Sequence, residues 1–126
     1  MFFLLLLSGL TTHSVRGLPE QDNRQNLTEE VALGKKVWED NNCIGCHTLL
    51  GEGAYFAPEL GIVYERFGHS NEAVKEFIQS RPVTGIPGRR SMPQFNLTDQ
   101  ELDAIAAFLK YSSEIKANNW PPNIQG

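Results

Sequence analysis

The sequence predicts an all-α fold for one domain. Residues 28–40 and 98–109 each begin with a capping signal and continue with apolar residues at helical spacing. No pair of segments has the alternating pattern and turn that predict paired strands. A chain of 126 residues has room for one domain and little left for a second.

The first ten residues, MFFLLLLSGL, are almost wholly apolar. As a helix they cover roughly 15 Å, about half of a bilayer core. No Lys or Arg precedes this run and no A-x-A site follows it, unlike in a secretory signal peptide. We therefore expect residues 1–17 to be part of a membrane anchor that starts upstream of Met1; a clipped signal peptide is the alternative. Either origin places the rest of the chain outside the cytoplasm, and residues 18–27, polar and aperiodic, are expected to be a linker.

The folded domain is expected to span residues 28–126, and its first helix starts at the capping residue Thr28. The next two residues are glutamates, which suit the positive end of the helix dipole. The predicted apolar face consists of Val31, Gly34, Val37 and Trp38. A glycine in mid-helix costs about 1 kcal/mol relative to alanine. We therefore expect another helix to cross closely at Gly34, beside Trp38, and the helix to end near residues 41–42.

The middle of the domain alternates between loops and short helices. Residues 48–57 contain two glycines and are expected to be a loop, and Pro58 opens an apolar stretch that predicts a helix of two or three turns. Ser70 can cap a helix over residues 71–79 that ends before Pro82. Its predicted buried side consists of Ala73, Val74, Phe77 and Ile78. Residues 81–95 form a long loop, which a compact domain seldom carries without a use.

The clearest helix begins at residues 98–101, whose sequence TDQE is a capping box. Its apolar stripe contains Leu102, Ile105, Ala106 and Leu109. This stripe is the expected partner of Gly34 and Trp38.

A C-x-x-C-H motif at residues 43–47 is typical of covalent attachment of a c-type haem. Cys43 and Cys46 would form thioethers with the haem vinyl groups, and His47 would reach the iron. A zinc site would need four ligands, and only His13 and His69 could complete it. A redox-active thiol pair would be expected to follow a strand, which is not predicted here. The net charge of −4 and pI near 5.3 argue against a nucleic-acid partner.

The second axial ligand of the iron is expected to be Met92, the only methionine besides Met1. A methionine more often fills a core gap, but Met92 lies in the long loop downstream of the motif. A thioether ligand favours Fe(II) and raises the reduction potential, and two filled axial positions leave electron transfer as the function. Arg89 and Arg90 are either a solvated pair or a clamp on a haem propionate.

The order of these features resembles class I cytochrome c. More specifically, residues 38–39 and 41–60 (NNCIGCHTLLGEGAYFAPEL), 87–95 (PGRRSMPQF) and 120–123 (WPPN) resemble the small cytochrome c subunit of bacterial nitric oxide reductase. This resemblance implies that the Pro58 carbonyl binds the His47 imidazole. It also implies that the Gly53 carbonyl and the Tyr55 hydroxyl help to bind a calcium ion between two subunits. By themselves, Gly53 would be a turn residue and Tyr55 a core aromatic.

The resemblance further implies an electron-transfer role in the bacterial cytoplasmic membrane, with the haem domain on the periplasmic side. Electrons would come from a periplasmic small cytochrome c or copper protein and pass to a multi-span haem b subunit, which reduces nitric oxide to nitrous oxide. That family has a complete transmembrane helix, whereas the apolar run here is about half as long. A freestanding periplasmic carrier is one alternative. A haem enzyme or gas sensor with an open iron is another, and it requires that Met92 be unbound.

Overall fold

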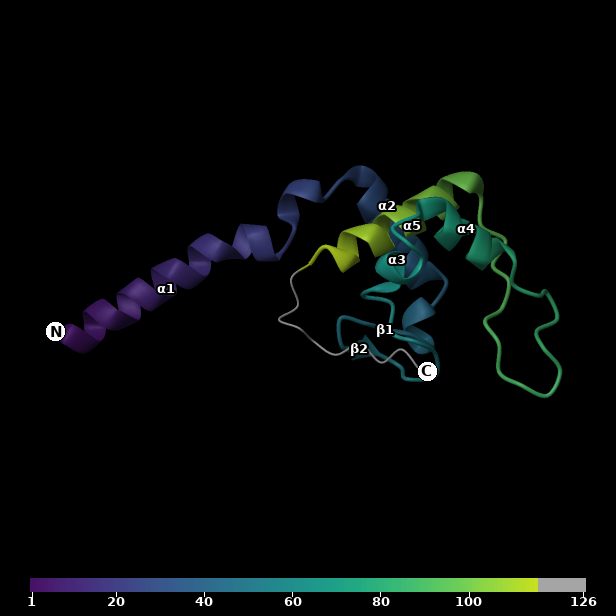
Figure 1. The fold of residues 1–126 in the computed structure, drawn as a ribbon, viewed down its shortest axis with the longest axis horizontal. Helices are drawn as coiled ribbons and strands as arrows, with labels where there is room; N and C mark the ends of the chain where they lie inside the picture. Colours follow the sequence, from purple (N-terminus) through teal and green to yellow (C-terminus); the bar gives the residue numbers. More distant parts are fainter. Residues whose placement is uncertain (116–126) are drawn as a thin grey trace.

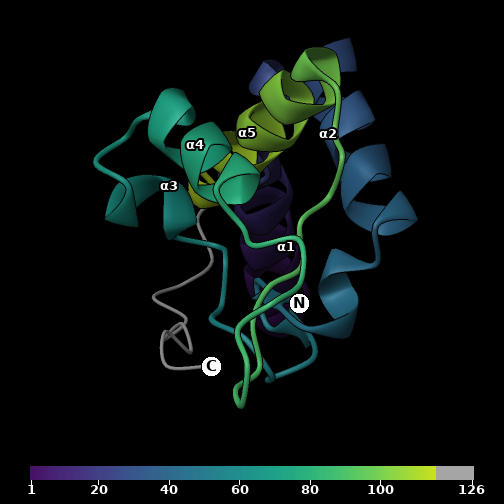
Figure 2. The same cartoon turned by 90° about the vertical axis from the view of Figure 1, so that its right-hand side faces the viewer.

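The computed structural model describes residues 1–115, and it is mostly helical. Its elements in chain order are α1 (Phe2–Gln21), η1 (Arg24–Asn26), α2 (Glu29–Asp40), η2 (Cys43–Gly45), β1 (Thr48–Leu49), β2 (Glu52–Gly53), α3 (Val63–Arg66), α4 (Asn71–Gln79) and α5 (Asp99–Ser113). Helix α1 extends away from the body that the other elements form (Figure 1). Helix α5 lies at the centre of this body, with α2 on one side and α3 and α4 on the other (Figure 2).

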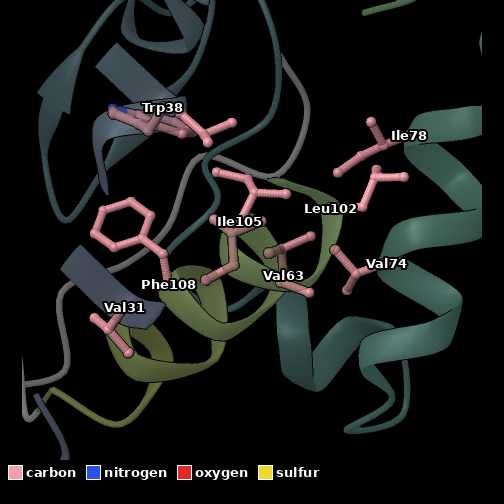
Figure 3. Close-up of a cluster of buried hydrophobic side chains, with 11 residues drawn as sticks. Val31, Trp38, Val63, Val74, Ile78, Leu102, Ile105 and Phe108 are labelled. Carbon is pink, nitrogen blue, oxygen red and sulfur yellow. The ribbon is translucent and has the colours of Figure 1, made fainter. Parts of the chain in front are cut away.

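Helices α2 and α5 cross at Gly34, as the sequence predicts. A Cβ atom on Gly34 would lie 2.0 Å from the Ala104 carbonyl oxygen and 2.6 Å from the Phe108 Cβ. The Trp38 ring packs beside this crossing, with its centroid 6.1 Å from that of Phe108 (Figure 3). The lack of a side chain at residue 34 is therefore what brings the two backbones together.

The other face of α5 is covered by α3 and α4. Val63, Val74 and Ile78 gather around Leu102 and complete one continuous core (Figure 3). Helix α3 has only four residues, Val63–Arg66, and is shorter than predicted. The chain leaves it through Gly68 and His69, which have φ angles of +67° and +59° and cannot continue a helix.

The buried side of α4 was predicted only in part, because Phe77 is 39% exposed. Its ring packs against that of Phe67, with centroids 5.3 Å apart, and the Arg81 guanidinium lies 3.9 Å from its centre. The three predicted helix caps, by contrast, are confirmed. Thr28, Ser70 and Thr98 each accept a backbone N–H of the first turn, and Thr98 forms the complete capping box with Glu101.

The segment predicted as a linker over residues 18–27 contains the end of a helix and a residue that contacts the folded domain. Helix α1 continues to Gln21, and Asn23 adopts a left-handed conformation with a φ of +57°. The buried Asn23 amide donates to the Tyr111 carbonyl at 3.1 Å and to the Glu114 carboxylate at 3.0 Å. Sequence periodicity cannot show such bonds, because they join residues about ninety positions apart.

A second difference is a two-residue antiparallel strand pair, β1 and β2, within the segment predicted to be a loop. Leu50 and Gly51 connect the strands with φ angles of +52° and +92°, and two positive φ angles are typical of a tight hairpin turn. The turn lacks the usual Asn-Gly sequence, so pattern reasoning does not identify it.

Met1 and the first half of α1 expose many apolar side chains. Met1, Phe2, Phe3, Leu4, Leu5, Leu6, Leu7 and Leu10 are all exposed. The hydroxyls of Thr11 and Thr12 donate to helix carbonyls four residues earlier, each at 2.8 Å. Among residues 1–115, no helix is both long and apolar enough to cross a membrane.

Candidate haem site

The two cysteines lie in a tight turn directly after α2. Asn42 adopts a left-handed conformation with a φ of +50°, and η2 then carries Cys43 toward the core. The amide of His47 donates to the Cys43 carbonyl at 2.9 Å, which closes the turn around the motif. A Cβ atom on Gly45 would lie 2.6 Å from the Asn42 side-chain nitrogen, so a larger residue there would require the Asn42 side chain to move. Both thiols are free, with Cys43 half-buried against the core and Cys46 exposed.

The environment of Cys43 argues against a redox-active thiol pair. Burial raises the pKa of the Cys43 thiol to about 11, whereas a reactive thiol needs a lowered pKa. Among residues 1–115, no three His, Cys, Asp or Glu side chains gather as a metal ion would require. The zinc site considered above therefore has no ligand set in the described part of the chain.

The imidazole of His47 is held in a defined orientation. Its Nδ1 lies 2.6 Å from the carbonyl oxygen of Pro58. Because a carbonyl can only accept, Nδ1 carries the proton and Nε2 keeps its lone pair. Burial lowers the pKa of His47 and favours the neutral imidazole, which is the form that binds metals. The Pro58 contact that the resemblance implies is thus present.

The segment after the strand pair wraps around the cysteine motif. The Ala54 amide donates to the Ile44 carbonyl at 3.0 Å, and the Ala57 amide donates to the Cys46 carbonyl at 2.9 Å. Gly53 lies so close that a Cβ atom would be 2.2 Å from the His47 carbonyl oxygen.

Tyr55 is the residue of this segment that differs from the sequence-based expectation. Its side chain is 61% exposed, so it is not the core aromatic that the residue type alone suggests. Gly53 is exposed as well. The two residues that the resemblance assigns to a calcium ion therefore lie at the surface, with Gly53 beside the His47 backbone.

Met92 comes from the long loop between α4 and α5 and packs half-buried against the core. A turn at Ile86–Arg89, with Gly88 at a φ of +76°, forms the tip of this loop. The Ser91 hydroxyl accepts the Ile86 amide at 3.1 Å, which folds the tip back toward Met92.

Arg90, two residues before Met92, contacts Phe56 in the segment that follows the cysteine motif. Its guanidinium lies 4.6 Å from the centre of the Phe56 ring, a cation–π contact. Arg90 is therefore more than a solvated charge, while a propionate contact by Arg89 or Arg90 stays a prediction. Sequence reasoning did not pair Arg90 with Phe56, because no pattern relates residues of two loops.

The donor set fits a covalently bound haem. Cys43 and Cys46 supply two unpaired thiols, His47 supplies a neutral imidazole with a free nitrogen, and Met92 supplies a thioether. The buried hydroxyl of Thr48 has no hydrogen-bond partner in the described part of the chain. Thr48 thus keeps an unused polar group directly after the imidazole.

The role of Glu59 was also not identified from the sequence. Its carboxylate is buried and accepts two backbone amides, from Leu50 and from Gly61. The available signal was a single acidic residue at the start of an apolar stretch that begins at Pro58.

Comparison with known proteins gives consistent matches. The family model described as cytochrome c matches residues 31–113. The chain is 54% identical to the C subunit of nitric oxide reductase from Stutzerimonas stutzeri over 130 residues, and 47% identical to that from Paracoccus denitrificans over 133. It is 43% identical to that from Halomonas halodenitrificans over 133 residues. Each match covers 100% of this chain and 88% of the relative. The resembling tail at residues 120–123 lies outside the described residues.

Proposed function

Because the chain belongs to the cytochrome c family and to the family of nitric oxide reductase C subunits, we propose that it is the electron-transfer subunit of a nitric oxide reductase. It delivers electrons to a catalytic subunit and does not itself convert a substrate. The observation that carries this proposal is the oriented imidazole of His47, which follows two free thiols and keeps one nitrogen available. The match along the full chain to relatives of this name favours a subunit over a freestanding carrier.

Four side chains would hold the cofactor. Cys43 and Cys46 would form the thioethers, and His47 and Met92 would be the axial ligands. When bound, haem c supplies a one-electron couple between Fe(III) and Fe(II). The Pro58 carbonyl fixes the His47 ring and increases its basicity. As an iron ligand, the soft Met92 sulfur would favour Fe(II), and together with His47 it would leave no position on the iron for nitric oxide. Reduction of nitric oxide therefore takes place in the partner subunit.

The apolar run of α1 is proposed to lie in the bacterial cytoplasmic membrane. Its exposed apolar side chains are numerous and consecutive, whereas a soluble surface seldom carries a large apolar patch. The bonds of Thr11 and Thr12 to helix carbonyls leave their hydroxyls satisfied without water, which suits a lipid environment. The haem domain, residues 28–126, would then lie on the periplasmic side and receive electrons from a small cytochrome c or a copper protein.

Gly53 and Tyr55 are proposed to help bind a calcium ion shared with the catalytic subunit. Both residues are exposed on the segment that wraps the cysteine motif. A backbone carbonyl and a hydroxyl are oxygen ligands of the type that calcium prefers, and further ligands would have to come from the partner.

The proposal is tested by isolating the protein from its native host with its membrane. We expect it to copurify with a multi-span haem b subunit, and we expect nitric oxide to reoxidise its reduced haem only in that complex. Recovery as a soluble monomer would contradict the proposal. Tyr55→Phe should weaken the complex and its calcium dependence, whereas Tyr64→Phe, on the half-buried Tyr64, should not. If the protein is instead a freestanding carrier, neither substitution should have such an effect.

A further inference from the structure

Glu59 is a buried acidic residue for which the proposed electron transfer has no direct use. Its side chain is 2% exposed. Its two carboxylate oxygens accept the amides of Leu50 and Gly61, each at 2.8 Å. Arg66 donates to the backbone carbonyl of Glu59 at 2.5 Å and not to the carboxylate. The two backbone amides offset the cost of burying the carboxylate. In return, the carboxylate fixes the positions of the two main-chain segments that supply these amides.

The two segments that Glu59 joins are the ones that set the His47 ring. Three bonds connect them in order along the chain. His47 Nδ1 donates to the Pro58 carbonyl at 2.6 Å, the Leu60 amide donates to the Thr48 carbonyl at 2.9 Å, and the Leu50 amide donates to Glu59. The carboxylate bond is therefore the last of the three and closes the pairing at the hairpin turn.

Two features make this last bond important for the first one. Pro58 has no N–H, so it cannot donate a backbone hydrogen bond that would help to hold its position. Leu50 has a φ of +52°, which is unfavourable for a residue with a branched side chain. The carboxylate holds Leu50 in that conformation and also fixes Gly61 on the far side of Pro58. On the near side of Pro58, the Ala57 amide donates to the Cys46 carbonyl at 2.9 Å, so the short segment that contains Pro58 is held at both ends.

We propose that Glu59 is a positioning residue for the axial imidazole, acting through Pro58. This inference rests on the proposed ligation of haem iron by His47. Loss of the carboxylate would free the segment around Pro58, lengthen its bond to Nδ1 and leave the ring less firmly oriented and less basic. A purely structural role would stabilise the hairpin turn without affecting that bond.

The test is hydrogen exchange measured by NMR in the reduced, diamagnetic holoprotein. In Glu59→Gln, one backbone amide faces the carboxamide nitrogen, which cannot accept its proton. We expect the His47 Nδ1 proton to exchange about fivefold faster or more, as expected for a weakened hydrogen bond, together with a shifted reduction potential. Glu52→Gln, on the exposed Glu52 of the same strand pair, should leave the Nδ1 proton and its exchange rate unchanged.

The result that would overturn the inference is faster exchange at the Leu50 and Gly61 amides with an unchanged His47 Nδ1 proton. Gly61→Ala gives a second route if Glu59→Gln yields no holoprotein. A Cβ atom there would lie 2.7 Å from a Glu59 carboxylate oxygen, so it displaces the carboxylate and should accelerate the same proton. If the His47 ring signals of the wild-type protein lack the large ring-current shift of a haem ligand, the proposed function fails, and this inference fails with it.

Discussion

The substitution Gly34→Ala tests the helix crossing on which the domain depends. The added Cβ atom would lie 2.0 Å from the Ala104 carbonyl oxygen, a backbone atom that cannot move aside as a flexible side chain can. Overpacking of this kind costs about 1–3 kcal/mol and occasionally more. Alanine also returns about 1 kcal/mol of helix propensity. Because both backbones must separate, we place the overpacking cost at or above the top of that range. After subtraction of the gain in helix propensity, the free energy of unfolding should fall by about 2–3 kcal/mol.

Thermal unfolding of the holoprotein measures this loss. For a domain of about 100 residues, 1 kcal/mol shifts Tm by about 4–8 °C. We therefore expect Gly34→Ala to lower Tm by about 10–20 °C and to alter the fluorescence of Trp38, which packs beside the crossing.

Gly9→Ala is the matched control, because a Cβ atom on Gly9, in α1, has no neighbouring atom within 4 Å. It should leave the Tm of the haem domain unchanged. A Gly34→Ala protein as stable as the wild type would refute the close contact between α2 and α5.

Two further changes test contacts between distant parts of the chain. Arg90→Ala removes the contact with Phe56, which is worth about 0.5–1 kcal/mol at an exposed site, so Met92 should leave the iron at a lower denaturant concentration, as followed by its near-red absorption band. Arg89→Ala should not change that concentration, and equal effects of the two variants would contradict the contact. Asn23→Ala removes the donor to the Tyr111 carbonyl and to the Glu114 carboxylate. Trypsin should therefore cleave after Arg24 faster, and an unchanged cleavage rate would count against the docking of Asn23.

Much of the fold could be predicted because its signals are local. The cap at Thr28, the capping box at Thr98 and the apolar stripes of α2 and α5 depend on residues within a few turns of one another. Gly34 was informative for a different reason. A glycine in mid-helix has a cost, and the close backbone contact at Ala104 explains why it is tolerated.

The features that escaped prediction depend on contacts between distant segments. Asn23 docks on α5 through its side chain, and nothing near it in the sequence indicates that partner. The hairpin turn at Leu50 is held by Glu59, a residue outside the turn, so the glycines of this segment predict a loop but not the strand pair. Phe77 is apolar and lies on the expected face of α4, yet it pairs with another aromatic ring at the surface.

In the candidate site, too, features with a local sequence signal could be predicted, and features that depend on distant contacts could not. The motif at residues 43–47 could be identified because covalent attachment requires a fixed spacing. The imidazole partner, Pro58, followed only from the resemblance to a known family, and the structure places its carbonyl 2.6 Å from Nδ1. Glu59, which supports that contact, could not be identified because the meaning of a buried carboxylate depends on the amides around it.

The central claim is that the chain holds a haem between His47 and Met92 and only transfers electrons. The most direct measurement is the weak near-red absorption band of the oxidised protein, which reports a methionine sulfur on ferric haem. We predict that the wild-type protein shows the band and that Met92→Ala loses it while keeping the haem covalently attached. An oxidised spectrum unchanged by Met92→Ala would contradict the claim.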